Sequence, residues 1–190
     1  MPASTNSLMT VYEGWDGYQR AIRQAVAPLT KEQLDWRPAA HLRSVGELVR
    51  HIALGRVDWF LRMGAPGSRE LAGQISDWDE DPHGNRYVMD SVITDTGQAS
   101  ELLKWLDLTW QMVDRTLNTW TVEDLKQTYR HTWRGDTYEV SRQWTTWRVM
   151  AHDLHHGGEL AVLLGMQGLD NFELGDLGGH IIEPPFADMS

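Results

Sequence analysis

The sequence predicts an all-α protein, a four-helix bundle with a long crossover loop and a short irregular C-terminal tail. Apolar residues recur at helical spacing in four long segments, at about residues 9–27, 44–63, 100–120 and 141–164. A polar, glycine-containing stretch separates the second segment from the third, and it is longer than most connections in compact domains. Four amphipathic segments with one long crossover are the pattern of an up-and-down or crossed bundle.

The boundaries of the first two helices rest on proline and on capping residues. Pro28 ends the first segment, and Thr30 is a plausible cap for a short helix at about residues 32–36. The second segment has the clearest start in the chain, because Ser44 and Glu47 form an S-x-x-E capping box directly before an apolar run. This helix is expected to end near Gly64.

Three other stretches are expected to be less regular. Residues 64–99 read as a lid, a binding loop or a disordered insert, with a short helix near residues 69–74. Residues 129–138 read as a hairpin or extended loop around Gly135-Asp136. The glycine- and proline-rich end of the chain is expected to pack loosely. We therefore assign residues 1–168 to the bundle and residues 169–190 to a tail packed on it or extending from it.

Composition and charge exclude several classes of function. The 190 residues suit one domain, and the absence of cysteine removes disulfides, thiolate metal sites and cysteine nucleophiles together. The formal charge of −10 opposes binding to nucleic acid or to an anionic membrane. The first ten residues do not resemble a signal peptide, and no apolar run is long enough to span a bilayer. We expect a cytoplasmic protein that acts on a small molecule.

A group of histidines in the fourth segment carries the chemistry. His152 and His156 stand four residues apart, so their imidazoles project from one helix face and can reach one metal ion. His51, beside the apolar stripe of the second segment, is the best candidate for a third ligand. A lone histidine at such a position is more often a core residue, and His155 could replace either partner at i, i+3 spacing. Spacing alone leaves both alternatives open.

Two further motifs, at residues 152–156 and 77–81, resemble known metal sites. Residues 152–156, His-Asp-Leu-His-His, resemble the H-E-x-x-H motif of zinc proteases with aspartate in place of the glutamate base. The shorter side chain, and the lack of an evident third-ligand motif downstream, argue against a protease. The acidic residues 77–81 suggest a calcium loop, but Pro82 stands where an EF-hand needs glycine. We interpret that run as a solvated acidic loop.

The order and spacing of the histidine motifs resemble the DinB/YfiT-like family of metal-binding four-helix bundles. Residues 44–52, Ser-Val-Gly-Glu-Leu-Val-Arg-His-Ile, are similar to the helix that carries the first histidine of that family. His152-x-x-x-His156 followed by Gly-Gly-Glu-Leu is similar to its H-x-x-x-H-R-G-Q pattern, and Gly165-Met166-Gln167-Gly168 matches the glycine turn that usually follows. The resemblance covers about residues 5–168.

The resemblance implies that His51, His152 and His156 hold one zinc or nickel ion, in a bundle that often forms a homodimer. It also implies activities such as metal-dependent transfer or isomerisation with low-molecular-weight thiols, mycothiol and bacillithiol among them. The chain departs from the family pattern at Gly157 and Glu159, where arginine and glutamine are common. The charge and hydrogen bonding at the rim of the site are therefore expected to differ.

Three functions remain open at this point. The first is a metal-dependent thiol S-transferase or a related enzyme, because three histidines leave a zinc ion one open position. The second is a metal-dependent hydrolase that uses a bound water, with Asp153 or Glu159 as the base. The third is a non-catalytic bundle that a metal ion stabilises.

Overall fold

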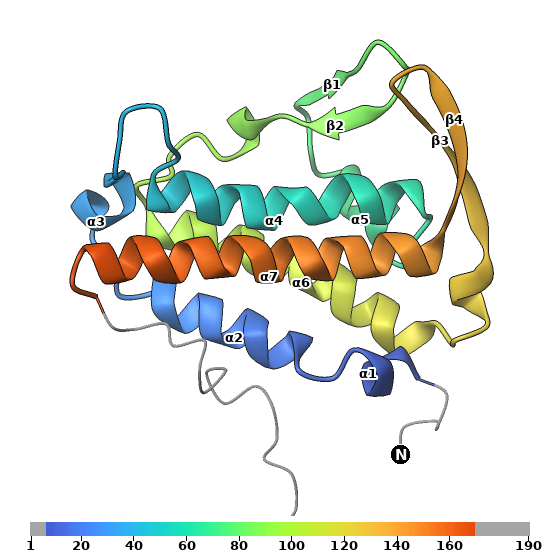
Figure 1. The fold of residues 1–190 in the computed structure, drawn as a ribbon, viewed down its shortest axis with the longest axis horizontal. Coiled ribbons are helices and arrows are strands. Elements are labelled where there is room, and N and C mark those ends of the chain that lie inside the picture. The colour runs from blue at the N-terminus through green and yellow to red at the C-terminus, as the bar shows by residue number, and fades with distance from the viewer. Residues whose placement is uncertain (1–6, 170–190) are drawn as a thin grey trace, which may run out of the picture.

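The computed structural model describes residues 7–169 and shows a mostly helical protein with two small antiparallel sheets (Figure 1). Its longest helices are four, and they correspond to the four predicted segments: α2 (Trp15–Val26), α4 (Val45–Arg62), α6 (Ala99–Thr119) and α7 (Arg142–Met166). Helix α4 packs against both α6 and α7, and α2 packs against α6. The mostly helical structure confirms the predicted class in part. The two small sheets depart from the all-α prediction.

The first predicted helix is divided in two. Helix α1 (Leu8–Val11) ends before α2 begins at Trp15, although the sequence predicted one helix over residues 9–27. The cause is Gly14, the N-cap of α2, whose φ of 95° lies in the left-handed region that favours glycine. The periodicity of the apolar residues continues across this break, so it could not reveal the interruption.

Capping boxes begin two helices, and the sequence predicted the one at Ser44. Ser44 Oγ accepts a hydrogen bond from Glu47 N at 3.2 Å, and Glu47 Oε2 accepts one from Ser44 N at 2.8 Å. The same reciprocal pair forms between Thr30 and Gln33 at the start of α3 (Lys31–Asp35). Because these bonds satisfy backbone donors that a helix leaves unpaired, they fix the residue at which each helix starts.

The stretch of residues 64–99 is a series of short elements rather than a disordered insert. It contains α5 (Ser68–Ala72), β1 (Trp78–Glu80), β2 (Arg86–Val88) and the 3-10 helix η1 (Asp90–Val92). Strands β1 and β2 pair antiparallel with Trp78 opposite Val88. The stretch is anchored to the helices by buried apolar side chains: Leu71, Ile75, Val88 and Ile93. The short helix predicted near residues 69–74 is present as α5.

The second hairpin confirms the extended segment predicted near residues 129–138. It follows a 3-10 helix, η2 (Asp124–Lys126), and consists of β3 (Thr128–Trp133) and β4 (Asp136–Ser141). Arg134 and Gly135 form the turn with φ of 53° and 90°, the positive values that a tight two-residue hairpin turn requires. Ser141 then caps α7 by accepting a hydrogen bond from Trp144 N at 3.1 Å.

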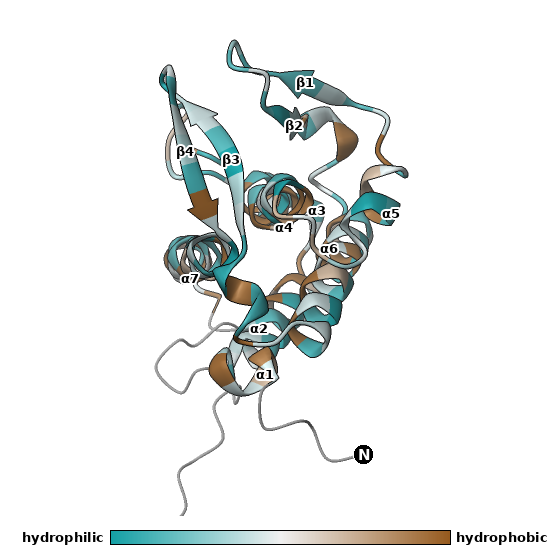
Figure 2. Ribbon diagram, turned by 90° about the vertical axis from the view of Figure 1, so that its right-hand side faces the viewer, coloured by the Kyte–Doolittle hydropathy of each residue, from teal (hydrophilic) through white to brown (hydrophobic). Residues whose placement is uncertain are grey.

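Both hairpins lie on the side of the helices away from α1 and α2, as Figure 2 shows. The core between the helices is apolar except for a few polar side chains, of which Arg56 is the largest and is fully buried. No helix in the described part of the chain combines the length and the apolar character needed to cross a membrane. Apart from Leu169, the predicted tail over residues 169–190 lies outside the described residues.

Candidate metal centre

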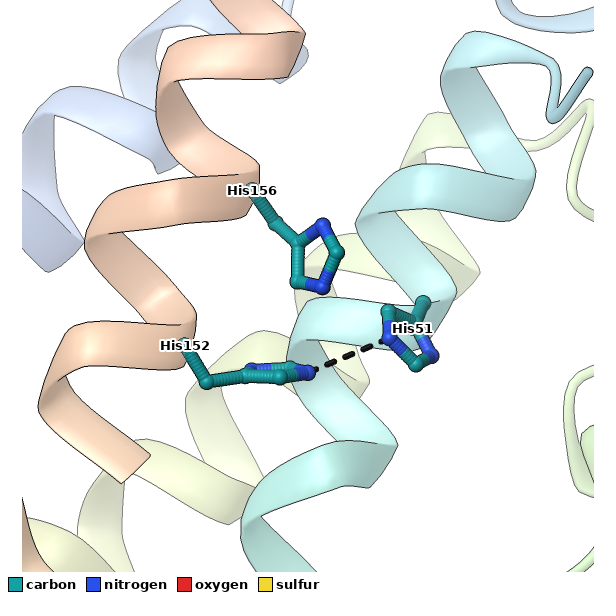
Figure 3. Close-up of side chains that lie close together, drawn as sticks. All are labelled: His51, His152 and His156. Atoms are coloured by element: carbon teal, nitrogen blue, oxygen red, sulfur yellow. Dashed lines mark hydrogen bonds between the residues drawn. The ribbon is translucent and has the colours of Figure 1, made fainter. Parts of the chain in front are cut away.

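The structure brings the three predicted histidines together from two helices. His51 lies on α4, and His152 and His156 lie one turn apart on α7. Their rings point toward one another in the space between the two helices (Figure 3). Each can offer one ring nitrogen such that the three atoms lie within 4.8 Å of one another. This cluster could bind a metal ion.

The spacing of the rings suits a small transition-metal ion. His152 Nε2 lies 3.1 Å from His51 Nε2. Two nitrogens that bind one tetrahedral zinc ion at about 2.0–2.1 Å lie roughly 3.3 Å apart. The ring centroid of His156 lies 4.6 Å from that of His51 and 4.5 Å from that of His152. The donor set therefore fits such an ion with small shifts of the side chains.

Burial favours the neutral form of His51 and His156, which is the form that a metal needs. Burial lowers the pKa of His51 to about 4, and the positive charge of Arg43 adds to the effect. Protonation of either neighbouring histidine would lower this pKa further, so the three rings do not become charged together. Burial also lowers the pKa of His156, although Glu159 opposes that shift. A neutral imidazole keeps a free lone pair, so the cluster is prepared for a cation near pH 7.

Glu159 orients one member of the cluster. Its Oε2 lies 2.7 Å from His156 Nδ1, and a proton on that nitrogen would leave Nε2 free to face the other two histidines. The hydrogen bond to His156 and the positive charges nearby lower the pKa of Glu159 against the effect of its burial. This carboxylate, one of the two candidate bases, therefore lies at the cluster and is ionised near neutral pH.

His155, the alternative ligand, lies outside the three-histidine cluster. Its side chain is 68% exposed, and its Nε2 lies 3.3 Å from Glu159. With His156 and Glu159 it forms a second group of potential ligands, which shares His156 with the first. The two groups differ in burial, since the side chains of His155 and Glu159 are 68% and 46% exposed, whereas that of His152 in the first group is 25% exposed.

Asp153, the other candidate base, is part of a buried ion pair. Its Oδ2 accepts hydrogen bonds from Arg56 Nε at 2.9 Å and from Trp15 Nε1 at 3.0 Å, and the side chain is fully buried. Its Oδ1 lies 3.6 Å from His152 Nδ1, and neither atom has a hydrogen-bond partner in the described part of the chain. This position suits a carboxylate that orients the His152 ring better than one that exchanges protons with solvent.

The network around Asp153 was not foreseen. Arg56 also donates to Gln19 Oε1 at 2.8 Å, and Gln19 Nε2 donates to the carbonyl of Leu106 at 3.2 Å. These bonds tie α2, α4, α6 and α7 together directly behind the histidines. The available signal was an arginine beside the apolar stripe of the second predicted helix, but a charge at that position is indistinguishable from one that faces solvent until its partner is known.

The geometry defines a helical protein with a three-histidine site between two helices, and comparisons with known proteins identify its family. Residues 15–160 match the model of the DinB superfamily. The chain therefore belongs to the DinB superfamily. No curated protein matches the sequence.

Solved structures support the same fold. A DinB-like protein from Bacillus cereus aligns with a TM-score of 0.62 at 16% identity, over 84% of this chain and 92% of that one. A DinB-like protein from Bacillus subtilis gives a TM-score of 0.54 at 17% identity, over 84% and 93%. A conserved protein from Enterococcus faecalis gives 0.55 at 16%, over 79% and 90%. At these identities the likeness concerns the fold alone.

Proposed function

We propose that this chain is a metal-binding four-helix bundle in which His51, His152 and His156 hold one divalent ion, zinc or nickel. The observation that carries the proposal is the convergence of three ring nitrogens within 4.8 Å. Three protein ligands are the arrangement of catalytic zinc sites, which keep a fourth position open for water or substrate. Bound in this way, the ion would act as a Lewis acid that lowers the pKa of a thiol or water.

We further propose that the activity is transfer of a low-molecular-weight thiol to a small electrophile. The chain contains no cysteine, so the sulfur nucleophile must come from outside. The thiol loses its proton, and its sulfur bonds to the electrophilic carbon. With an aryl chloride, chloride leaves; with an epoxide, the C–O bond breaks and the released oxygen takes up a proton. Glu159, ionised and 2.7 Å from His156, would take up the proton released by the thiol and pass it to solvent.

A metal-dependent hydrolase is the alternative that a specific observation favours. Glu159 is the carboxylate at the rim of the cluster, and the same group could take a proton from water instead of from a thiol. Asp153 is less suited to this role, because it is fully buried and paired with Arg56. For either activity we propose a homodimer in the cytoplasm that acts on a small molecule.

The test has two parts that separate metal binding from catalysis. Elemental analysis of protein purified without an affinity tag should find about one divalent ion per chain. Metal-loaded protein should then accelerate conjugation of mycothiol, bacillithiol, glutathione or coenzyme A to chlorodinitrobenzene or an epoxide, in proportion to metal occupancy. Full occupancy without acceleration by any of these thiols would refute the transferase and leave the hydrolase and the non-catalytic bundle. Absence of metal would refute the site itself.

A further inference from the structure

A cavity lies between α4 and α7, the two helices that carry the histidine cluster, and none of the three histidines lines it. It has a volume of ≈ 530 Å³ and is bounded by α4, α7 and the hairpin β3–β4, which stands beside these helices in Figure 2. Pockets that hold small molecules range from about 300 to 1,000 Å³. Arg148, in its wall, precedes His152 by one helical turn, about 6 Å along the axis of α7. The cavity is therefore a neighbour of the histidine cluster and is lined by other side chains.

Aromatic rings form most of its wall. Trp59 of α4 meets Trp144 of α7 with ring centroids 5.8 Å apart, and it meets His131 of β3 at 5.1 Å. Trp133 and Tyr138 contribute from the hairpin. The exposed fractions of Trp133, Tyr138 and Trp144 are 54%, 46% and 47%. Large aromatic surfaces gathered around a cavity and left open to solvent are typical of a binding site.

A positive charge stands over this aromatic wall. The guanidinium carbon of Arg148 lies 4.8 Å from the ring centroid of Trp59 and 5.4 Å from that of Trp144. Arg62 approaches the Trp59 ring at 4.9 Å. Within residues 7–169, neither arginine forms an ion pair with a carboxylate, although the chain as a whole carries a formal charge of −10. Arg62 also donates a hydrogen bond to the carbonyl of Arg86 at 2.8 Å, so Arg148 is the arginine whose N–H donors remain available to an anion.

Two further polar side chains line the cavity. Glu139 is exposed and lies on β4. His131 has a buried Nδ1 without a hydrogen-bond partner among the described residues. Burial and the positive charge of Arg62 lower the pKa of His131, so this side chain adds a neutral polar group. The charged groups at the cavity are then Arg148, the neighbouring Arg62 and the carboxylate of Glu139. The lining thus combines flat aromatic surface, one unpaired guanidinium in the wall and a second beside it.

We propose that this cavity binds a small aromatic acid, with the ring packed against Trp59 and Trp144 and the carboxylate or sulfonate bonded to Arg148. The ring matches the aromatic wall, and the anion matches the unpaired guanidinium. The site does not depend on the histidine cluster, because no candidate metal ligand lines the cavity. Binding should therefore occur with or without a metal ion.

The test compares two probes that share the same fused rings, by isothermal titration calorimetry of metal-free protein. Naphthoate carries an anion, and naphthol carries a neutral hydroxyl on the same rings. Naphthoate should bind at least about tenfold more tightly than naphthol, and Arg148→Gln should remove that preference while leaving the affinity for naphthol unchanged. The matched control is Arg86→Gln, since Arg86 stacks on Trp78 at 4.7 Å outside the cavity. That variant should bind both probes as the parent does.

A second variant tests the aromatic wall. Trp144→Leu should weaken both probes to a similar extent, with a circular dichroism spectrum like that of the parent because half of this side chain is exposed. Equal affinity for the two probes, or no effect of Arg148→Gln, would overturn the proposal. Preference for naphthylmethylammonium would also overturn it and assign the site to cations through Glu139. Sedimentation showing that Trp144→Leu dissociates a dimer, with no naphthoate bound by the parent, would instead make this face an interface between copies.

Discussion

Gly55 of α4 lies directly against the imidazole of His152 on α7. A Cβ at this position would stand 2.6 Å from Cε1 of His152 and 3.0 Å from Nε2, closer than such atoms approach in proteins. Gly55 follows His51 by one helical turn on the same helix. Helix α4 thus supplies one histidine of the cluster and, one turn later, leaves the space that another histidine occupies.

Gly55→Ala should therefore disturb metal binding without replacing any of the three histidines. The added methyl group must displace the His152 ring from its position 3.1 Å from His51, and we expect the affinity for zinc to fall at least about tenfold. Competition with a chromophoric chelator measures this. Gly165→Ala is the matched control, because nothing lies within 4 Å of a Cβ there. It should keep full affinity and gain up to about 1 kcal/mol of stability. An unchanged affinity in Gly55→Ala would show that the ring position does not matter.

Alanine substitutions at two adjacent histidines, His155 and His156, can test which of them is a ligand from α7. His156→Ala should abolish binding of one divalent ion per chain, as should His51→Ala and His152→Ala, because each removes a member of the three-histidine cluster. His155→Ala should bind metal normally, since its side chain is largely exposed and outside that cluster. Elemental analysis of the four variants after dialysis against the ion gives the answer. Loss of metal in His155→Ala with retention in His156→Ala would reverse the assignment.

The histidine cluster could be predicted from sequence because it depends on local spacing and on one long helix. A spacing of four places His152 and His156 on one face whatever the rest of the fold does. His51 needed more. Its place beside the apolar stripe made it the best candidate but did not distinguish it from a core histidine, and the family resemblance then supported it. Gly55 and Arg56 could not be interpreted at all. Their roles depend on atoms of α7 almost a hundred residues away, and no local pattern encodes that contact.

The buried ion pair between Arg56 and Asp153 should be costly to break on one side only. The two side chains are fully buried with a 2.8 Å contact. Arg56→Met leaves a buried carboxylate without its partner, and we expect a loss of about 3–5 kcal/mol in the free energy of unfolding by urea. The double variant Arg56→Met with Asp153→Leu should recover much of that loss, because no uncompensated charge remains. Destabilisation by the double variant equal to the sum of the single effects would contradict this explanation.

A surface pair provides the comparison for that experiment. Arg20 and Asp16 also approach to 2.8 Å, but both side chains are open to solvent. Water and salt screen such a pair, so Arg20→Gln should change the free energy of unfolding little. A large effect at this position would mean that the method responds to the loss of any arginine rather than to burial.

Asp58 of α4 is hydrogen-bonded to the first hairpin. Its Oδ1 accepts a hydrogen bond from Val88 N at 2.9 Å. Burial nevertheless raises the pKa of Asp58 to about 6 from an ordinary value of 3.8, against the lowering effects of that hydrogen bond and of Arg62. Between about pH 4 and pH 6 the folded chain therefore binds this proton more tightly than the unfolded chain does. Its contribution to stability is favourable below this range and is lost as the pH rises through 6.

Asp58→Asn should accordingly stabilise the protein at pH 7.5 and give no gain at pH 4. The amide oxygen can still accept the hydrogen bond from Val88, while the buried charge is removed, and two pKa units limit the gain to about 3 kcal/mol. Thermal unfolding of variant and parent at both pH values measures the difference. Asp79→Asn is the control of opposite sign: Glu80 N and Tyr87 hydrogen-bond this exposed carboxylate and lower its pKa, so the substitution should destabilise at pH 7.5. A lower melting temperature of Asp58→Asn at pH 7.5 would show that the ionised carboxylate is needed to hold the hairpin.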